Sequence, residues 1–376
     1  MSEAQEREPQ DAPAGGRRRV LEVSGSAAGG VRAHLGQCAR LLAQAGHDVI
    51  VEAPARLLEG LDLGGARAEA LELGDRPGPG DLLVLARLHR LGREAAVVHA
   101  HGLRAGAAAA LALGRRRAGR ARLVVTLHNL PVGGRLTRWV GERLHAVVCT
   151  HADLVLAVSP DLAERARQAG CPQVELAVVP SPQRSPGPDP DAAATPWPQG
   201  VGRLLTVARL APQKGLDLLL DTAALLSQEV AARRLPPLLW LVAGEGPGRQ
   251  GAQERIQAEG LPVRLLGRRE DTDTLMRQAD LVVQTSLWEG QPLTVQEALR
   301  AGAAVLATDV GGTAYTARGA ALLAPPQAPE LAERASGLLR DPQALDTLRQ
   351  RAQQAAAGLP GEEQLRQQLV TALSLG

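Results

Sequence analysis

The chain has 376 residues, and its 42 lysines and arginines against 40 aspartates and glutamates give a formal charge of +2 at pH 7. A length of this order predicts two domains, each large enough to bury its own core. The near balance of charge argues against a general nucleic-acid binder, so an anionic partner has to be met locally.

The cysteines and the first residues of the chain indicate in which compartment of the cell the protein is expected. Cys38, Cys149 and Cys171 are far apart and form no C-x-x-C pair, so their spacing implies neither a disulfide framework nor a zinc ribbon. This pattern favours the reducing cytoplasm. Residues 1–18 are polar, which predicts a disordered tail rather than a signal peptide. The sequence contains no run of about 18 apolar residues, so no membrane span is predicted.

An alternation of short apolar strands and amphipathic helices starts at residue 19. The first strand is followed by a Gly-rich turn, a helix over 31–45 and a strand over 49–51. Such alternation is typical of a parallel sheet covered by helices, here in an N-terminal domain over 19–180. Further strands of this domain are expected at 96–99, 123–126 and 154–158.

Residues 181–200 are dense in proline and lack periodicity, so we interpret them as an exposed linker. The alternation then restarts and predicts a second parallel sheet in a C-terminal domain over 201–358. A last helix over 359–376 closes the chain, and packing back on the N-terminal domain is one option for it. The strands of the second domain are expected at 204–207, 238–243, 263–266, 281–284 and 304–308. Its helices are expected at 216–226, 248–259, 272–278, 293–301, 329–340 and 342–357.

Two cations follow the first strand of the second domain. Arg209 and Lys214 come after residues 204–207, and Gly215 opens a helix. Lys214 is the only lysine in a chain rich in arginine, which hints at a chemical need. Two cations beside the start of a helix suit a diphosphate, and a solvated loop with ordinary surface charges is the alternative. Two tandem α/β sheets bind ligands at the carboxyl ends of their strands, so such residues are expected to face a cleft.

A pair of glutamates follows the strand over 281–284. Glu289 lies in a loop and Glu297 lies one turn into the next helix. Gly290 permits close backbone approach, and Pro292 suits the first turn of that helix. The two carboxylates could accept hydrogen bonds from the hydroxyl groups of a sugar and a ribose, although isolated glutamates at such positions are usually solvated or capping residues.

The motifs together resemble a known family. Five of them occur in order: Gly-Gly at 29–30, Thr-Leu-His-Asn at 126–129, Ala-Arg-Leu-x-x-x-Lys-Gly at 208–215, Gly-x-Gly-Pro at 244–247 and Glu-Gly-x6-Glu-Ala at 289–298. In this combination the chain, from about residue 19 onward, resembles the GT-B fold retaining glycosyltransferases of family 4. The resemblance implies an α/β fold of GT-B architecture, with two Rossmann-like parallel-sheet domains facing an interdomain cleft.

The resemblance also implies a function. A sugar would move, with retention at its anomeric carbon, from a nucleoside-diphosphate sugar to a glycan, lipid or small-molecule acceptor, with no metal and no other cofactor. Arg209 and Lys214 would neutralise the diphosphate. Glu289 would hold hydroxyl groups of the sugar and Glu297 those of the ribose, while His128 would lie near the anomeric carbon.

Further positions carry over from the same resemblance. His101 is expected on the acceptor side. The leaving phosphate would take the proton of the acceptor, so the protein needs no general base. The remaining donor-binding positions implied by the resemblance are Gly29, Gly30, Gly244, Gly246, Arg268, Gly290, Pro292, Leu293 and Thr294.

The sequence departs from the family pattern in places and leaves alternatives open. Tyr315 stands where an acid usually ends a Gly-Gly-x-x-Glu element. A nucleotide-sugar epimerase of the same fold, or a catalytically silent scaffold protein, would share most of these motifs. His99 and His101 alternate on a strand and invite a metal interpretation, but packing is the favoured one and no metal is expected.

Contact with an anionic membrane is a further possibility. The arginine run from Arg115 to Arg122 is either a solvated helix end or a contact with acidic headgroups or a phosphorylated acceptor. Residues 136–145, with Trp139 among arginines, could extend such a surface at the inner face of the membrane.

Overall fold

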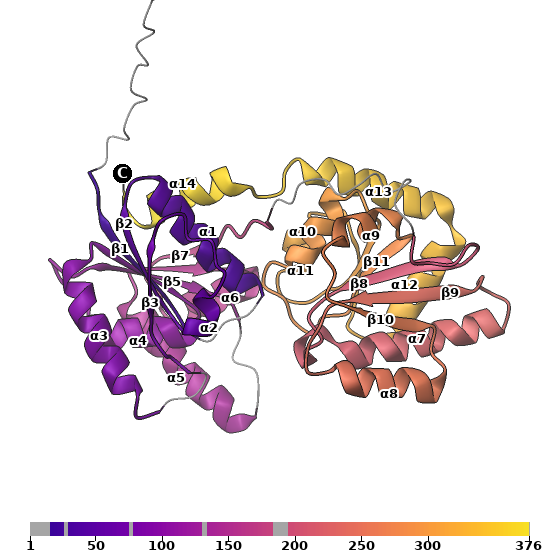
Figure 1. Cartoon of the computed structure of the whole chain (residues 1–376), viewed down its shortest axis with the longest axis horizontal. Coiled ribbons are helices and arrows are strands. Elements are labelled where there is room, and N and C mark those ends of the chain that lie inside the picture. Colours follow the sequence, from indigo (N-terminus) through magenta and orange to yellow (C-terminus); the bar gives the residue numbers. More distant parts are fainter. Residues whose placement is uncertain (1–15, 26–28, 75–77, 130–133, 183–194, 376) are drawn as a thin grey trace, which may run out of the picture.

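The computed structural model in Figure 1 describes residues 16–25, 29–74, 78–129, 134–182 and 195–375. Two parallel sheets stand side by side, each covered by helices. The N-terminal sheet has the strand order β3-β2-β1-β4-β5-β6-β7, and the C-terminal sheet has the order β10-β9-β8-β11-β12-β13. The predicted α/β class with two parallel sheets is confirmed.

The N-terminal sheet consists of β1 (Arg19–Ser24), β2 (Asp48–Ala53), β3 (Arg67–Ala70), β4 (Val97–His101), β5 (Arg122–Leu127), β6 (Leu154–Ala157) and β7 (Val174–Leu176). The helices of this half are α1 (Gly30–Gln44), α2 (Ala55–Leu58), α3 (Asp81–Glu94), α4 (Leu103–Leu113), α5 (Arg135–His151) and α6 (Pro160–Gln168).

The C-terminal sheet consists of β8 (Gly202–Val207), β9 (Leu238–Ala243), β10 (Val263–Gly267), β11 (Leu281–Gln284), β12 (Val305–Thr308) and β13 (Leu322–Ala324). A short 3-10 helix, η1 (Pro212–Lys214), precedes α7 (Leu216–Ala231). The other helices are α8 (Arg249–Glu259), α9 (Thr272–Gln278), α10 (Leu293–Arg300), α11 (Thr313–Ala317), α12 (Ala328–Arg340), α13 (Pro342–Ala356) and α14 (Glu362–Ala372).

The central strands are covered on both faces, and their sequences are therefore almost continuously apolar. Leu123, Val124 and Val125 of β5, for example, are completely buried. Glu22 and His99 are polar exceptions on β1 and β4, and they too are completely buried. Because a buried charge must be paired to be tolerated, these exceptions mark a place where the sheet carries a polar network.

The chain crosses between the domains twice, between β7 and β8 and between α13 and α14. Gln296 of α10 is fully buried and bonds the first crossing: its Oε1 accepts from the backbone N–H of Ser181 at 3.0 Å and its Nε2 donates to the carbonyl of Val179 at 2.9 Å. Arg300 donates to the hydroxyl of Ser181 and, at 2.8 Å, to the carbonyl of Pro360 in the second crossing. α10 therefore anchors both crossings.

The last helix, α14, packs on the N-terminal domain beside α1 (Figure 1). Leu365 and Leu369 belong to the hydrophobic core of that domain. Arg122 donates through Nε to the carbonyl of Ala372 at 2.9 Å. The C-terminus thus ties the second half of the chain to the first.

The segment predicted as an exposed linker is exposed at Thr195 and at residues 198–200, but two of its described residues are buried. Ser181 is buried, and Trp197 is only 3% exposed, with its Nε1 donating to the carbonyl of Leu239 at 3.0 Å. The indole is large and mostly apolar, so burying it against β9 stabilises the fold more than solvent exposure would. Residues 183–194, like the expected tail at 1–15, lie outside the described residues.

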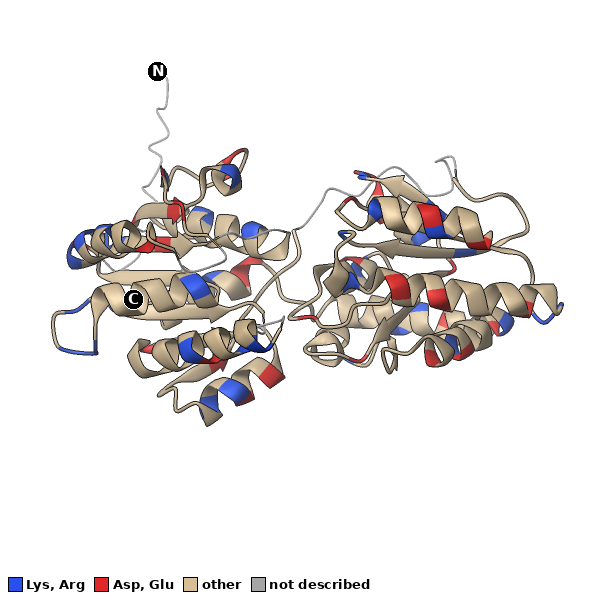
Figure 2. Ribbon diagram, turned by 90° about the horizontal axis from the view of Figure 1, so that it is seen from below, with Lys and Arg blue, Asp and Glu red and all other residues tan. Residues whose placement is uncertain are grey.

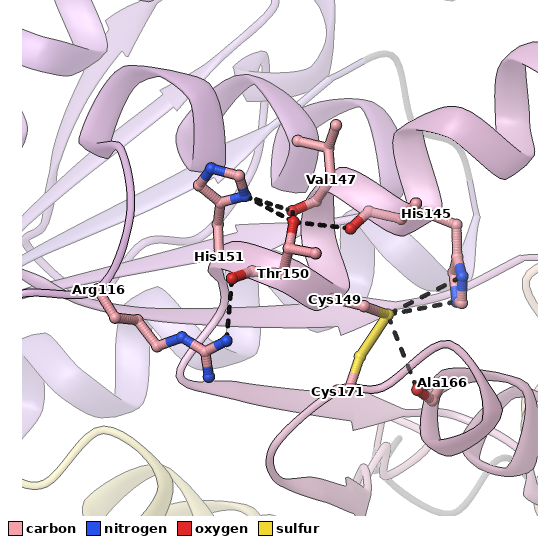
Figure 3. Close-up of a disulfide and its surroundings, with 9 residues drawn as sticks. Arg116, His145, Val147, Cys149, Thr150, His151, Ala166 and Cys171 are labelled. Atoms are coloured by element: carbon pink, nitrogen blue, oxygen red, sulfur yellow. Dashed lines mark hydrogen bonds between the residues drawn. A yellow bond between two sulfur atoms is a disulfide. The ribbon is translucent and has the colours of Figure 1, made fainter.

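A disulfide joins Cys149, in the last turns of α5, to Cys171, which follows α6 (Figure 3). The spacing of the cysteines did not imply such a bond, and this part of the sequence interpretation is corrected. The two residues are 22 positions apart and belong to no local motif. They meet only because α5 and α6 flank β6, which the sequence spacing alone does not reveal. Cys38 is free and buried.

None of the described helices is both long and apolar enough to cross a lipid bilayer.

Candidate functional site

A cavity of about 370 Å³ lies between the two domains. In the N-terminal sheet the strand order reverses between β1 and β4, and in the C-terminal sheet it reverses between β8 and β11. The cavity lies at these two points, and open α/β sheets bind ligands at such points. Its volume is in the range of small-molecule sites. The structure brings most of the predicted site residues to this cavity, namely Gly29, Gly30, His128, Arg209, Lys214, Glu289, Gly290, Pro292, Leu293, Thr294 and Glu297.

The lone lysine is paired with one of the two predicted glutamates. The Nζ of Lys214 lies 2.5 Å from Oε1 of Glu289, and the hydroxyl of Ser286 donates to the same oxygen at 2.6 Å. The side chain of Glu289 is 8% exposed and that of Lys214 is 26% exposed. This pairing places a carboxylate at the wall of the cavity and leaves two of the lysine's three N–H groups for other acceptors.

Backbone contacts hold the two loops of this pair together. Gly215 has φ +63°, and a Cβ there would lie 2.0 Å from the carbonyl oxygen of Thr285, so only glycine fits. The hydroxyl of Thr285 donates to the carbonyl of Lys214 at 3.1 Å, and the amide of Gln213 donates to the carbonyl of Trp288 at 2.9 Å. Because β8 and β11 are neighbours, these bonds fix the cation and the carboxylate in one arrangement.

Arg209 is exposed and lines the cavity, and its side chain makes no hydrogen bond or ion pair with any residue that the structure describes. Its backbone is held from behind by the turn after β9. A Cβ on Gly244 would lie 1.8 Å from the carbonyl of Ala208, and one on Gly246 would lie 2.5 Å from that of Leu210. The two glycines thus allow the β9 turn to pack directly under the loop that presents the guanidinium.

The N-terminal end of α10 forms another wall of the cavity. Pro292 caps the helix, so the N–H groups of its first residues, Leu293 and Thr294, point out of the helix end. A Cβ on Gly30 of α1 would lie 3.5 Å from Cδ1 of Leu293, so the two domains approach each other here. A Cβ on Gly290 would lie 2.4 Å from Val158 of the other domain, which explains why glycine follows Glu289.

Behind the cavity the N-terminal sheet holds a buried polar network. Glu22 accepts from His99 Nδ1 at 3.1 Å through Oε1 and pairs with His101 Nε2 at 2.6 Å through Oε2. His101 Nδ1 lies 3.4 Å from Nε2 of His128, which lines the cavity. The ring of His34, from α1, packs edge-on against those of His101 and His128.

Burial and mutual contacts shift the pKa values in this network. Burial acts to raise the pKa of Glu22, but contacts with His99 and His101 outweigh it and lower that pKa to about 2. Burial, and then the neighbouring histidines, lower the pKa of His101 and hold that of His128 well below its ordinary value. Glu22 is therefore ionised near neutral pH, and His101 and His128 are neutral.

Cys38, His99 and His101 have potential ligand atoms within 4.8 Å of one another, which raises the possibility of a metal site. Their nitrogen atoms are already engaged. His99 bonds Glu22 through Nδ1 and, at 2.8 Å, Thr126 through Nε2, while both nitrogens of His101 bond Glu22 and His128. Binding a metal at these atoms would break the hydrogen bonds of this network.

Several predicted residues lie away from the cavity. His101, expected on the acceptor side, has a fully buried side chain behind His128, since its partner Glu22 is itself inside the sheet. Arg268 is exposed at the end of β10 and does not line the cavity. Gly244 and Gly246 support Arg209 rather than facing the cavity. Tyr315 borders a separate cavity of about 180 Å³ next to the C-terminal crossing.

Some lining residues escaped the sequence interpretation. Asn129, Gln213 and Gln291 border the cavity, and Ser286 supports Glu289. Asn129 is the only asparagine of the chain and ends the Thr-Leu-His-Asn motif, but the sequence interpretation gave it no role of its own.

Comparisons with known proteins bear on the identity of this fold. Two family models match the chain, a glycosyl transferase 4-like domain over residues 29–182 and glycosyl transferases group 1 over residues 189–356. The uncharacterised glycosyltransferase YqgM of Bacillus subtilis is 28% identical over 142 residues, which are 37% of this chain and 37% of that relative. The chain thus matches well under half of this relative's length.

Solved structures match over nearly the whole chain. Anabaena Alr3699/HepE in complex with UDP and glucose has a TM-score of 0.71 and 22% identity, covering 95% of this chain and 100% of that one. Sucrose-phosphate synthase from Thermosynechococcus elongatus has a TM-score of 0.74 and 20% identity, covering 95% and 98%. With both family models matched in order and two parallel sheets facing one cavity, the chain has the GT-B fold and belongs to the group 1 glycosyltransferases.

Proposed function

We propose that this protein is a retaining glycosyltransferase that moves a sugar from a nucleoside-diphosphate sugar to a hydroxyl group of an acceptor. The observation that carries the proposal is Arg209, a cation without a partner in the described chain, in a cavity that also contains Lys214 and the N-terminal end of α10. A diphosphate could pair with both cations and accept hydrogen bonds from the free N–H groups at the start of the helix. UDP is the first nucleotide to test, because the structurally similar Anabaena protein was crystallised with UDP and with UDP-glucose.

The charges of the cavity fit the bond that has to break. When the bond between the anomeric carbon and the phosphate oxygen breaks, positive charge builds on the sugar ring and negative charge on the diphosphate. Lys214, held by Glu289, and the N–H groups of Leu293 and Thr294 are fixed in advance and would stabilise the negative charge together with the guanidinium of Arg209. We propose that these groups take the place of a metal ion.

The remaining steps follow from retention. The acceptor oxygen forms its bond to the anomeric carbon on the face that the diphosphate leaves, and the acceptor's proton passes to the departing phosphate oxygen. The products are the glycoside and the nucleoside diphosphate. Glu289, held by Lys214 and Ser286, would accept hydrogen bonds from the sugar's hydroxyl groups, and Glu297 would accept those of the ribose.

Nucleotide binding tests the proposal directly. Calorimetric titrations of UDP, GDP and ADP without metal would compare the natural protein with Arg209→Gln, and with Arg264→Gln as a matched exposed arginine outside the cavity. We expect one nucleotide to bind, and Arg209→Gln to weaken it about tenfold to a hundredfold through lost charge-assisted hydrogen bonds. Arg264→Gln should bind normally. Absence of binding by all three nucleotides, or normal binding by Arg209→Gln, would overturn the proposal.

Retention and the acceptor class need a second experiment. The nucleotide-sugar that corresponds to the best-binding nucleotide would be incubated with glycan, lipid and small-molecule acceptors. The proton NMR spectrum of the first product gives the configuration at its anomeric carbon. We expect the configuration of the donor, and inversion would refute the retaining mechanism.

We further propose that the start of α5 contacts an anionic membrane. Part of the arginine run considered first for this role is bound to the domain: Arg116 donates to the carbonyl of Thr150 at 2.9 Å and Arg120 pairs with Asp153 at 2.7 Å, while Arg115 and Arg117 are exposed. Acidic and basic residues are interspersed over both domains in Figure 2, so any attraction to lipid has to be local. The start of α5 supplies such a place.

In that segment two large apolar side chains lie among arginines. Leu136 is 75% exposed and Trp139 is 54% exposed, and the guanidinium of Arg143 lies 5.3 Å from the indole ring. Arg135 and Arg138 are exposed on the same turns. Apolar side chains flanked by arginines are typical of helices that lie at the interface of an anionic bilayer.

A further inference from the structure

The histidine next to the proposed sugar position is held by groups that no known role of the cavity requires. His128 lines the cavity, yet its Nε2 points back to His101 at 3.4 Å, and His101 in turn contacts Glu22 at 2.6 Å. The side chains of Glu22 and His101 are both completely buried. Burying a carboxylate in the middle of a sheet costs free energy unless the carboxylate is paired and hydrogen-bonded. The role of Glu22 therefore has to be sought in the groups that it contacts.

Hydrogen-bond chemistry fixes the direction of each contact in the chain. An ionised carboxylate only accepts, so Nε2 of His101 must carry the proton that it shares with Glu22. A neutral imidazole has one donor and one acceptor, so Nδ1 of His101 is an acceptor and the 3.4 Å contact is donated by Nε2 of His128. The same carboxylate receives Nδ1 of His99 on its other oxygen, so it has no freedom to rotate away.

We propose that Glu22 and His101 are positioning residues that fix His128 in its Nε2-protonated tautomer, so that Nδ1 presents a lone pair to a sugar hydroxyl in the cavity. His128 Nδ1 makes no hydrogen bond with the described part of the chain. This inference rests on the proposed function for the identity of the hydroxyl, but the tautomer itself follows from the geometry.

The other groups that face the histidine agree with this assignment. His34 packs its ring edge-on at 5.5 Å from that of His128, its Nε2 contacts the thiol of Cys38 at 3.6 Å, and its Nδ1 is buried without a hydrogen-bond partner, so no described bond from His34 competes with the His101 contact of His128. His99 is satisfied by Glu22 and Thr126. Burial keeps the pKa of His128 low, which leaves its lone pair available near neutral pH.

The tautomer can be measured without any substrate. In the long-range proton–nitrogen NMR spectrum of uniformly ¹⁵N-labelled protein, the ring signals of His128 are assigned by their loss in His128→Gln. We expect the Nε2-protonated form in the natural protein and a shift toward the Nδ1-protonated form in Glu22→Gln, since the amide can donate to His101 and reverse the chain. An Nδ1-protonated His128 in the natural protein would overturn the proposal, even if Glu22→Gln failed to fold.

A matched variant separates positioning from simple loss of stability. Glu52 is also a completely buried glutamate, on the neighbouring strand β2, but it pairs with Arg87 far from His128. Glu52→Gln should lose stability and leave the tautomer unchanged. An equal change of tautomer in both variants would refute the role of Glu22.

Kinetics supply the functional half of the test. Glu22→Gln is expected to lower kcat about tenfold to a hundredfold while the affinity for the nucleoside diphosphate stays unchanged, because the diphosphate is held by the other domain. Unchanged kcat together with a changed tautomer would show that the lone pair of His128 is not used. If no donor supports transfer at all, the proposed function fails, whereas the tautomer measurement still decides this inference.

Discussion

At the scale of single residues, Lys214 is expected to have two separable roles. Lys214→Ala removes a charge that stabilises the leaving diphosphate, and we expect turnover to fall about a hundredfold or more. It also leaves the carboxylate of Glu289, 8% exposed, with only Ser286 as a partner, so the free energy of unfolding should fall by about 1–3 kcal/mol. Urea unfolding and initial rates measure the two effects.

A second substitution distinguishes the two roles of the lysine. Adding Glu289→Gln to Lys214→Ala removes the uncompensated charge, so stability is expected to recover while activity stays low. Near-normal turnover of Lys214→Ala alone would mean that the lysine serves only to pair with Glu289.

The buried histidines are expected to make the protein less stable in acid. The pKa values of His34, His101 and His128 lie below their ordinary 6.5 in the fold, mainly through burial. As the pH falls below about 6.5, the unfolded chain takes up protons that the folded protein resists, so the free energy of unfolding falls. Glu22, whose pKa is about 2 against an ordinary 4.5, adds a further loss between those two values.

Urea unfolding curves measured between about pH 7.5 and pH 5.5 would show this loss. His34→Gln should reduce the slope. A midpoint independent of pH over this range would show that the cluster accepts protons without cost.

The sequence predicted the site residues that directly follow a strand. It missed the residues that are brought together only by the register in which two strands pair. Arg209, Lys214 and Glu289 follow strands that become neighbours in any sheet with this topology. Glu22 gave no such signal, because only the pairing of β1 with β4 places it opposite His99. Ser286 bonds Glu289 and Gln213 bonds the carbonyl of Trp288. These contacts depend on how two loops pack against each other, which no local sequence pattern predicts.

At the scale of elements, the strands missed by the sequence interpretation are short and lie at sheet edges or near them. β3 (Arg67–Ala70) and β7 (Val174–Leu176) end the N-terminal sheet, and β13 (Leu322–Ala324) ends the other. An edge strand is covered less completely, so it needs no continuous apolar run and leaves a weak pattern. The central strands, which position the cavity, were all found.

The disulfide between α5 and the segment after α6 is expected to stabilise the N-terminal domain. The bond closes a loop across a separation of 22 residues and so lowers the conformational entropy of the unfolded chain. In the chain-entropy model this loss raises the free energy of unfolding by about 3 kcal/mol. Reduction should therefore lower the free energy of unfolding by an amount of that order. Urea curves with and without dithiothreitol measure it, and the double variant Cys149→Ala/Cys171→Ala should not respond to the reductant. Equal curves for the natural protein would mean that the bond adds nothing.

The start of α5 is expected to control binding to anionic vesicles. Leu136→Ser/Trp139→Ser removes two exposed apolar side chains, and we expect partition onto phosphatidylglycerol vesicles to fall about tenfold or more. Leu111→Ser is the matched control, because Leu111 is 54% exposed on α4 of the same domain. Co-sedimentation with vesicles of phosphatidylglycerol and of phosphatidylcholine measures the partition. Equal binding to both lipids, or equal loss in the control, would contradict the contact.

At the scale of the whole molecule, α10 connects the cavity to the arrangement of the domains. Thr294 and Glu297 face the cavity, whereas Gln296 and Arg300 bond the two crossings between the domains. A ligand held at the start of this helix therefore acts on the element that fixes how the domains are joined. Gln291, just before the helix, extends this seam between the domains, since its amide donates to the carbonyl of Ala177 at 2.5 Å.

Gln296→Leu is expected to loosen this seam. Leucine fills a similar volume but leaves the N–H of Ser181 and the carbonyl of Val179 unpaired, at a cost of about 1–3 kcal/mol for each group. Thermal unfolding should start at a lower temperature, and small-angle X-ray scattering should show a larger radius of gyration as the domains move more freely. Gln367→Leu, at an exposed glutamine of α14, should change neither quantity. If Gln296→Leu kept the natural melting temperature and radius, the domains would have to be held by the packing of α14 on α1 rather than by α10, and substituting Leu365 and Leu369 would then produce the effect instead.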